Sequence, residues 1–273
     1  MRSRLMSILF LVIAAACGAS PTGEPALETE ADEPLPPCET REGEVRVQSD
    51  RDAASLRNVC EIRGAIFVAF GSTTTLRWPR LVRIEGTLFV GQNDALEVVE
   101  LPALTTVTGG FSFTDNLALA RIDLTALTDG GTGFYVGDNA ALAELDLPIA
   151  NVPQDSGFIL DNASLERLSL PRLPGVGYDL QIAGNGRLVD VVLTTLADVE
   201  QGLTLEGTGA VVLGFPALTR VGGNLSVRDN VLLQRLEAPL LLTEGGSRVD
   251  VVGNPALEAC VGDALAGTFD CRP

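Results

Sequence analysis

The chain has 273 residues and a formal net charge of −17 at pH 7. Such an acidic protein has no basic surface for a phosphate backbone, so nucleic acid is excluded as a partner. The chain contains neither histidine nor lysine. Its basic side chains are therefore all arginines, and no basic stripe is visible among them.

Residues 1–16 resemble a bacterial lipoprotein signal peptide. Two arginines precede the apolar run 5–13, and three alanines stand directly before Cys17. The segment is a secretion signal, too short to span a membrane permanently. The resemblance implies cleavage before Cys17 and acylation of that cysteine, so that the membrane is contacted through the lipid anchor only. An ordinary secretion signal with an incidental cysteine is the alternative.

Residues 17–37 join this anchor to the rest of the chain. After Cys17 they contain five prolines and five acidic residues but no basic residue, which predicts a disordered acidic, proline-rich tether. Gly18 follows the cysteine, where many bacterial lipoproteins kept in the inner membrane have aspartate. By that resemblance the predicted location is the bacterial outer membrane, facing either the periplasm or the cell exterior.

From residue 38 onward the sequence is dominated by an internal repeat. Asparagine recurs every 23 residues and then, after Thr208 in the same slot, with spacings of 22 and 24; the positions are Asn93, Asn116, Asn139, Asn162, Asn185, Asn230 and Asn254. A period of this length is typical of a solenoid, in which each coil buries its apolar edge against its neighbours.

Apolar residues around each asparagine indicate how a coil is built. Before Asn116 they alternate at Phe111 and Phe113, as in a short strand with one face inward, and after it prolines recur where a helix would otherwise form. We therefore predict an all-β fold for residues 38–273, a single right-handed parallel β-helix or leucine-rich-type solenoid of about ten coils. The coil from Asp155 is expected to carry Phe158 and Leu160 one place out of phase.

The asparagines themselves are interpreted as structural. A side-chain amide offers both a donor and an acceptor, so a stacked column of amides can satisfy turn backbone groups in adjacent coils without burying charge. A direct role in ligand binding is the less favoured alternative.

The five cysteines fit an exported protein. Lipidation of Cys17 leaves two pairs, one at each end of the solenoid. We predict disulfides Cys38–Cys60 and Cys260–Cys271, each contributing ~3 kcal/mol and covering an exposed terminal coil. A metal site is the poorer alternative, because the chain has no Cys-x-x-Cys and no histidine.

The repeat unit from Gly86 to Val107 reads Gly-x-Leu-x-Val-x-x-Asn-x-x-Leu-x-x-Val-x-Leu-Pro-x-Leu-x-x-Val with its apolar slots filled. It resembles the receptor L domain, the leucine-rich solenoid of insulin-receptor and epidermal-growth-factor-receptor relatives, over about residues 38–271. The resemblance implies a right-handed β-helix that binds protein ligands and has no catalytic activity. Other leucine-rich repeat subclasses are the nearest competing family.

One row of outward strand positions is a candidate ligand-binding surface. It lies four residues before each asparagine slot and holds aromatic side chains in its first half, namely Phe67, Phe89, Tyr135 and Phe158. Aromatic side chains in a row suit sugar rings, apolar side chains or a partner surface. The alternative is that Phe158 turns inward and that loops or self-association shield the others.

A second candidate is the acidic column directly before the asparagines, at Asp115, Asp138 and Asp161. Stacked carboxylates could bind calcium. Aspartate before asparagine is also ordinary turn chemistry, and glycine interrupts the column further along, so no metal is assigned.

Catalysis is not expected. Nearly uniform coil lengths leave no large loop to wall a cleft, and neither a histidine base nor a Gly-x-Ser-x-Gly or phosphate-binding motif is present. The sequence predicts a lipid-anchored, non-catalytic surface protein without cofactors that recognises a protein or glycan. A purely structural envelope lipoprotein is the alternative, a polysaccharide-acting β-helix enzyme is less favoured, and the oligomeric state is left open.

Overall fold

The computed structural model describes residues 37–150, 152, 155–242 and 248–261. Within these ranges the chain coils into a parallel β-solenoid with a period of about 23 residues and about nine full turns. The all-β solenoid predicted from the repeat is confirmed. The signal segment, Cys17 and the tether as far as residue 36 lie outside the described residues, so their predicted roles stay predictions.

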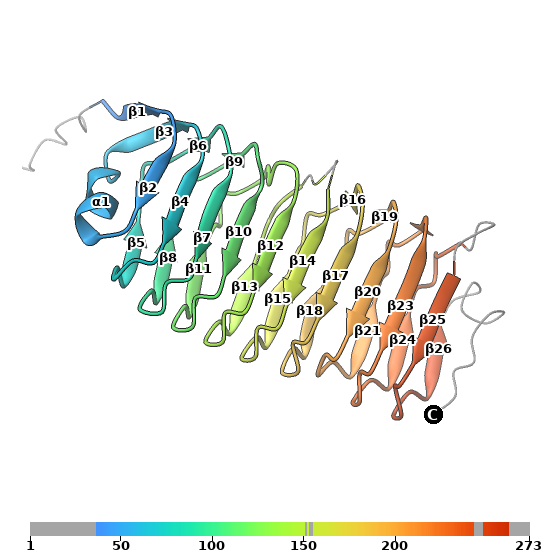
Figure 1. The fold of residues 1–273 in the computed structure, drawn as a ribbon. Helices are drawn as coiled ribbons and strands as arrows, with labels where there is room; N and C mark the ends of the chain where they lie inside the picture. The colour runs from blue at the N-terminus through green and yellow to red at the C-terminus, as the bar shows by residue number, and fades with distance from the viewer. Residues whose placement is uncertain (1–36, 151, 153–154, 243–247, 262–273) are drawn as a thin grey trace, which may run out of the picture. The chain divides into compact units, whose positions relative to one another are not determined.

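One parallel sheet of ten strands runs the length of the solenoid and contains one strand from each coil (Figure 1). We call it the main sheet. In spatial order its strands are β2 (Val45–Val47), β4 (Ile66–Ala69), β7 (Leu88–Gly91), β10 (Phe111–Thr114), β12 (Phe134–Gly137), β14 (Gly157–Leu160), β17 (Leu180–Ala183), β20 (Leu203–Glu206), β23 (Asn224–Arg228) and β25 (Arg248–Val252).

The remaining strands are shorter and form further parallel sheets around the coils. After each turn that follows a main-sheet strand come β5 (Thr75–Arg77), β8 (Val98–Glu100) and β11 (Arg121–Asp123), then β13 (Glu144–Asp146), β15 (Arg167–Ser169) and β18 (Asp190–Val192), then β21 (Val212–Gly214), β24 (Arg235–Glu237) and β26 (Ala259–Val261). Leading back to the main sheet are β1 (Glu39–Glu42), β3 (Val59–Arg63), β6 (Arg83–Ile84) and β9 (Thr106–Val107), and β16 (Gly175–Val176), β19 (Asp198–Val199) and β22 (Arg220–Val221).

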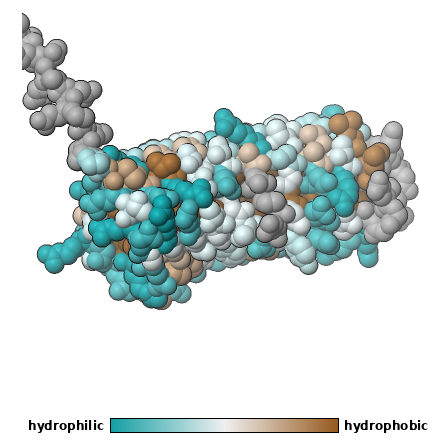
Figure 2. Space-filling view, turned by 90° about the horizontal axis from the view of Figure 1, so that it is seen from above, coloured by the Kyte–Doolittle hydropathy of each residue, from teal (hydrophilic) through white to brown (hydrophobic). Residues whose placement is uncertain are grey.

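Leucine, isoleucine, valine and phenylalanine side chains fill the interior of the coils. Alternate residues of the main-sheet strands point inward, and those of β7, Leu88 and Val90, are fully buried. Apolar side chains that remain exposed lie in separate small patches on the face shown in Figure 2. Each coil therefore buries its apolar edge against the coils on either side, as a repeat of this length requires.

The asparagine ladder lies inside the solenoid at the turn that follows each main-sheet strand. Asn139 is fully buried, and its amide Nδ2 donates to the Phe113 carbonyl (2.9 Å), the Gly137 carbonyl (2.9 Å) and Asn162 Oδ1 (3.2 Å). Its Oδ1 accepts from the backbone N–H (3.3 Å) and Nδ2 (3.1 Å) of Asn116. One side chain thus binds two neighbouring coils, in agreement with the structural interpretation.

Thr208 continues the ladder by a different set of bonds. Its hydroxyl and its backbone N–H both donate to Asn230 Oδ1, at 2.7 Å and 2.9 Å. The hydrogen bonding to the next coil toward the C-terminus is therefore kept at this position. An asparagine here would additionally offer an amide to the preceding coil, as Asn185 Nδ2 does to the Ile159 carbonyl at 2.9 Å.

A short helix, α1 (Asp50–Ser55), lies at the N-terminal end of the stack beside β2 (Figure 1). Ser49 caps it, because its Oγ accepts from the Asp52 N–H (3.3 Å) and donates to the Asp52 carboxylate (2.7 Å). Within the described ranges this is the one α-helix, and it has neither the length nor the hydropathy of a membrane-spanning segment. The repeat gives no indication of it.

The predicted disulfide Cys38–Cys60 is present, with a Cα–Cα distance of 5.5 Å. It joins the chain just before β1 to β3 and closes a loop with a sequence separation of 22 residues, which stabilises the fold by about 3 kcal/mol in the chain-entropy model. Cys260 lies in β26, whereas Cys271 lies outside the described residues. The pairing Cys260–Cys271 therefore stays a prediction.

Candidate functional site on the main sheet

The outward row of the main sheet is in register from coil to coil. Parallel pairing aligns the predicted positions in one line, with Arg46 at its start: Arg46, Phe67, Phe89, Ser112, Tyr135, Phe158, Gln181, Thr204, Ser226 and Asp250. Adjacent members are about 4.8 Å apart along the solenoid. The row forms a continuous line in which the first half is aromatic and the second half is polar.

Phe158 belongs to this outward row, so the expected phase shift of its coil is wrong. Phe158 pairs with Tyr135 and Gln181, and Leu160 also points outward, while Gly157 and Ile159 occupy the inward slots. A Cβ atom on Gly157 would lie 2.5 Å from the ring of Phe134. The interior space of this coil is therefore filled from the preceding coil, which explains why a glycine replaces the usual apolar residue.

The aromatic half consists of two pairs of half-buried rings. Phe67 and Phe89 have a centroid distance of 6.1 Å, and Tyr135 and Phe158 one of 6.3 Å. Both pairs are tilted, and the Arg46 guanidinium lies 5.7 Å from the Phe67 centroid. The four aromatic residues predicted from the sequence thus lie on one surface. They form two contacting pairs, Phe67 with Phe89 and Tyr135 with Phe158.

Two of these rings lie against glycines on the same strand. A Cβ atom added to Gly91 would lie 2.5 Å from Cζ of Phe89, and one added to Gly137 would lie 2.6 Å from Cε1 of Tyr135. Both glycines are buried although they point outward. The rings of Phe89 and Tyr135 therefore cover the backbone of their own strands, and no larger residue fits beneath them.

The acidic column lies beside the aromatic half, one residue before the ladder. Asp115, Asp138 and Asp161 have φ angles of 54°, 56° and 54°, a left-handed conformation that aspartate tolerates better than most residues. Turn geometry thus accounts for their residue type. In the part of the chain that the structure describes, no group of three or more histidine, cysteine, aspartate or glutamate side chains could hold a metal ion.

Electrostatic coupling links this column to the aromatic row. Partial burial raises the pKa of the Asp138 carboxyl, and the charges of Asp115 and Asp161 raise it further. Burial also raises the pKa of the Tyr135 hydroxyl, with smaller contributions from the same three carboxylates. The column and Tyr135 therefore share one acidic surface.

Because the pKa of Asp138 is raised, we expect Asp138→Asn to increase the folding stability in a pH-dependent way. Because folding favours the protonated carboxyl, the ionised form opposes folding increasingly as pH rises from about 4 through the raised pKa. The variant should be more stable than the parent at pH 7, by less than about 1 kcal/mol for an exposed charge. Urea midpoints at pH 7 and pH 3 test this, and an equal gain at both values would show that the charge is not the cause.

Phe70 occupies the same left-handed slot two coils before Asp115, with φ 55°, and its side chain is 73% exposed. A bulky residue in this conformation is strained, whereas asparagine adopts it readily. We expect Phe70→Asn to stabilise the solenoid by about 1 kcal/mol. The measurement is the urea unfolding midpoint, and a loss of stability would show that the Phe70 ring makes a contact that outweighs the strain.

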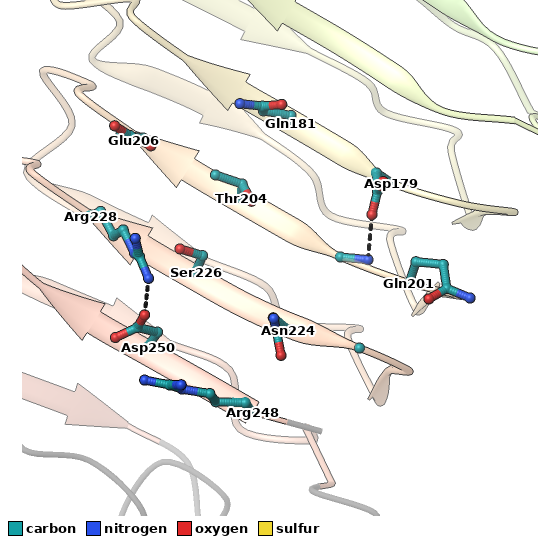
Figure 3. Close-up of a pocket in the computed structure, with 12 residues that line it drawn as sticks. Asp179, Gln181, Gln201, Thr204, Glu206, Asn224, Ser226, Arg228, Arg248 and Asp250 are labelled. Atoms are coloured by element: carbon teal, nitrogen blue, oxygen red, sulfur yellow. Dashed lines mark hydrogen bonds and ion pairs between the residues drawn. The ribbon is translucent and has the colours of Figure 1, made fainter. Parts of the chain in front are cut away.

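The polar half of the row lines a groove. The groove has a volume of about 540 Å³ and lies on the outward face of β17, β20, β23 and β25 (Figure 3). Its lining comprises carboxylates, amides, hydroxyls and two guanidinium groups, including Asp179, Gln181, Thr204, Glu206, Ser226, Arg228, Arg248 and Asp250. The surface offers hydrogen-bonding groups of both kinds.

Two interactions hold side chains of this groove in place. Asp179 Oδ1 accepts from the Gly202 N–H at 2.8 Å, and Arg228 forms an ion pair with Asp250 on the neighbouring strand. Sequence reasoning placed several of these residues on the outward row but did not single them out as a site. The signal was present, because Gln181, Thr204 and Ser226 are consecutive polar members of the row, but without apolar rings they resembled an ordinary solvated face.

Comparisons with known proteins identify no relative of this chain. No protein-family model matches the chain, and neither the curated proteins nor the solved structures give a significant match. The chain is therefore described by its fold, a parallel β-solenoid.

Proposed function

We propose that this protein is a non-catalytic, lipid-anchored surface protein of the bacterial outer membrane whose main sheet recognises a ligand, either a protein or a glycan. The observation that supports it best is the outward row, which is unbroken over ten coils and changes from half-buried aromatic rings to a polar groove. The resemblance to the receptor L domain and the signal peptide ending at Cys17 support the same proposal from the sequence.

The rigidity of the scaffold favours recognition. Parallel pairing fixes every main-sheet strand, and the buried ladder adds bonds between the turns that follow β7 to β25, so the outward side chains are held at set spacings without ordering on binding. The carboxylates of the groove that the structure shows engaged, Asp179 and Asp250, serve a backbone amide and an arginine. These partners suit a binding surface better than a pair of free acid and base groups.

Replacing the aromatic side chains of Phe89 and Tyr135 tests the proposal. Phe89→Ser combined with Tyr135→Ser should abolish binding of the labelled protein to intact cells while leaving the fold intact, because both side chains lie on the outer face. Some stability should be lost, because the half-buried rings cover the backbone at Gly91 and Gly137. The control is Leu117→Ser with Leu240→Ser, which removes exposed apolar side chains outside the main sheet. Equal binding by the two double variants would contradict the proposal and favour a purely structural envelope role.

Anchoring and orientation are tested separately. Cys17→Ser should release the protein from the membrane fraction, since a secretion signal without the acylated cysteine leaves no lipid chain. Protease treatment of intact cells then distinguishes the two orientations, because only a protein that faces the exterior is cleaved. Retention of the Cys17→Ser variant in the membrane would refute the lipid anchor.

A further inference from the structure

We propose that the ligand of the main sheet is a linear, uncharged polysaccharide that lies parallel to the solenoid axis, with sugar rings stacked on Phe89 and Tyr135. This inference rests on the proposed function and specifies the ligand class of the same surface. Its basis is the geometry of the two rings, their spacing and the chemistry of the groups around them.

The rings of Phe89 and Tyr135 lie over glycines. Because Gly91 and Gly137 carry no side chain, the two rings reach over the strand backbone, and each ring is half-buried, with the rest of its surface accessible to a ligand. The face of an aromatic ring carries negative potential and attracts the weakly positive C–H groups of a pyranose. A protein partner usually anchors an aromatic or arginine side chain in a pocket, whereas Phe89 and Tyr135 are half-buried rings on the outer face of the main sheet.

The spacing between Phe89 and Tyr135 matches a polysaccharide repeat. Phe89 and Tyr135 are two coils apart in a strictly in-register row, with Ser112 between them. Two strand spacings amount to about 10 Å. An extended β-1,4-linked polysaccharide repeats every two sugars at about this length, so sugars of the same orientation would meet both rings. The small Ser112 leaves room for the intervening sugar.

The charge around the rings favours a neutral ligand. Asp115, Asp138 and Asp161 border the Tyr135 ring, and carboxylates accept hydrogen bonds from sugar hydroxyls. The same carboxylates repel an anionic ligand, as does the net charge of −17. A neutral polysaccharide therefore suits this surface better than a uronic acid polymer or a sulfated one.

The aromatic half of the row is continuous with the polar groove. Beyond Phe158 the row continues as Gln181, Thr204 and Ser226, and Figure 3 shows these side chains along successive strands of the groove. A chain that follows the axis would leave the rings and enter a surface of amides and hydroxyls. Such groups exchange hydrogen bonds with sugar hydroxyls without requiring apolar side chains from the ligand.

The test is calorimetric titration of the full chain, in a detergent without a sugar headgroup, against cellohexaose, chitohexaose and hexagalacturonate. We expect at least one neutral hexasaccharide to bind, its disaccharide to bind at least about tenfold more weakly, and hexagalacturonate not to bind. Phe89→Ala and Tyr135→Ala should each weaken binding about tenfold or more, whereas Tyr135→Phe and Leu117→Ala should retain it. Tyr135→Phe keeps the ring over Gly137 and thus guards against a folding defect.

Absence of binding to both neutral hexasaccharides would overturn the inference, as would equal binding of hexagalacturonate or indifference to both alanine variants. The two proposals fail in distinguishable ways. If the Phe89→Ser, Tyr135→Ser variant loses binding to cells while no hexasaccharide binds, the glycan inference falls and recognition of a protein remains. If neither experiment depends on the rings, the proposed function falls as well.

Discussion

Asn139→Leu is expected to destabilise the solenoid by about 3–5 kcal/mol. Leucine has the same branched outline as asparagine, but its methyl groups are bulkier than the amide oxygen and nitrogen, so the change removes the amide and also crowds the buried turn. The backbone N–H of Asn116 loses its acceptor, and the Phe113 and Gly137 carbonyls each lose a donor, all inside a buried turn. Leaving buried polar groups without partners costs more than the bonds themselves contribute.

The central position of Asn139 in the solenoid increases the expected loss of stability. Each coil contacts its neighbours only, so weakening the step between two central coils uncouples the halves on either side. Chemical unfolding followed by circular dichroism should show a lower midpoint and a broader transition than the parent. Hydrogen exchange should be fastest in β10, β12 and β14, the strands on either side of the lost amide.

Asn139→Thr is the matched control, because threonine occupies this slot naturally at position 208. There the hydroxyl keeps the bond to the next amide at 2.7 Å. The control should therefore lose the bonds toward Asn116 and Phe113 but keep the bond toward Asn162, and should cost about half as much as leucine. If the unfolding free energy of Asn139→Leu lies within about 1 kcal/mol of the parent value, the ladder is a consequence of the fold and does not stabilise it.

The features predicted from the sequence are those that recur in every coil. The strand slots, the inward leucines and the alignment of the outward row follow from one period, and a parallel sheet repeats them at fixed spacing. The four aromatic residues could be placed together for the same reason. The buried role of Asn139 was predictable because an amide can both donate and accept, and a recurring charged residue could not have been buried at that position.

The features that were missed depend on single residues. Gly157 breaks the apolar pattern because Phe134 of the preceding coil fills its space, a contact between coils that no period reveals. Helix α1 occurs once, and its one local sign is the cap formed by Ser49 with Asp52. The polar groove depends on the side-chain arrangement of four strands, whereas its residue types alone resemble any solvated face.

Trp78 provides a physical reason for helix α1. This residue follows β5 in the interior row that Leu101 continues in the next coil, and it is fully buried. Its indole Nε1 donates to the Ala53 carbonyl of α1 at 2.9 Å. Helix α1 follows β2 in the first described coil, at the place where the second coil has β5, and Trp78 of the second coil is joined to it by this hydrogen bond.

Trp78→Ala is expected to cost about 3–5 kcal/mol, since it removes the largest buried side chain of this end and a buried hydrogen bond. Phe215→Ala is the matched control, because Phe215 lies in the corresponding interior row, equally buried, in a coil without a helix. Both variants should lose stability by circular dichroism, but Trp78→Ala alone should accelerate hydrogen exchange in α1 and β2. Unchanged protection of residues 50–55 would contradict the capping role. If the result holds, the first described coil is held in place by a tryptophan of the second coil, because the end of a solenoid has to bury a surface for which the repeat offers no partner.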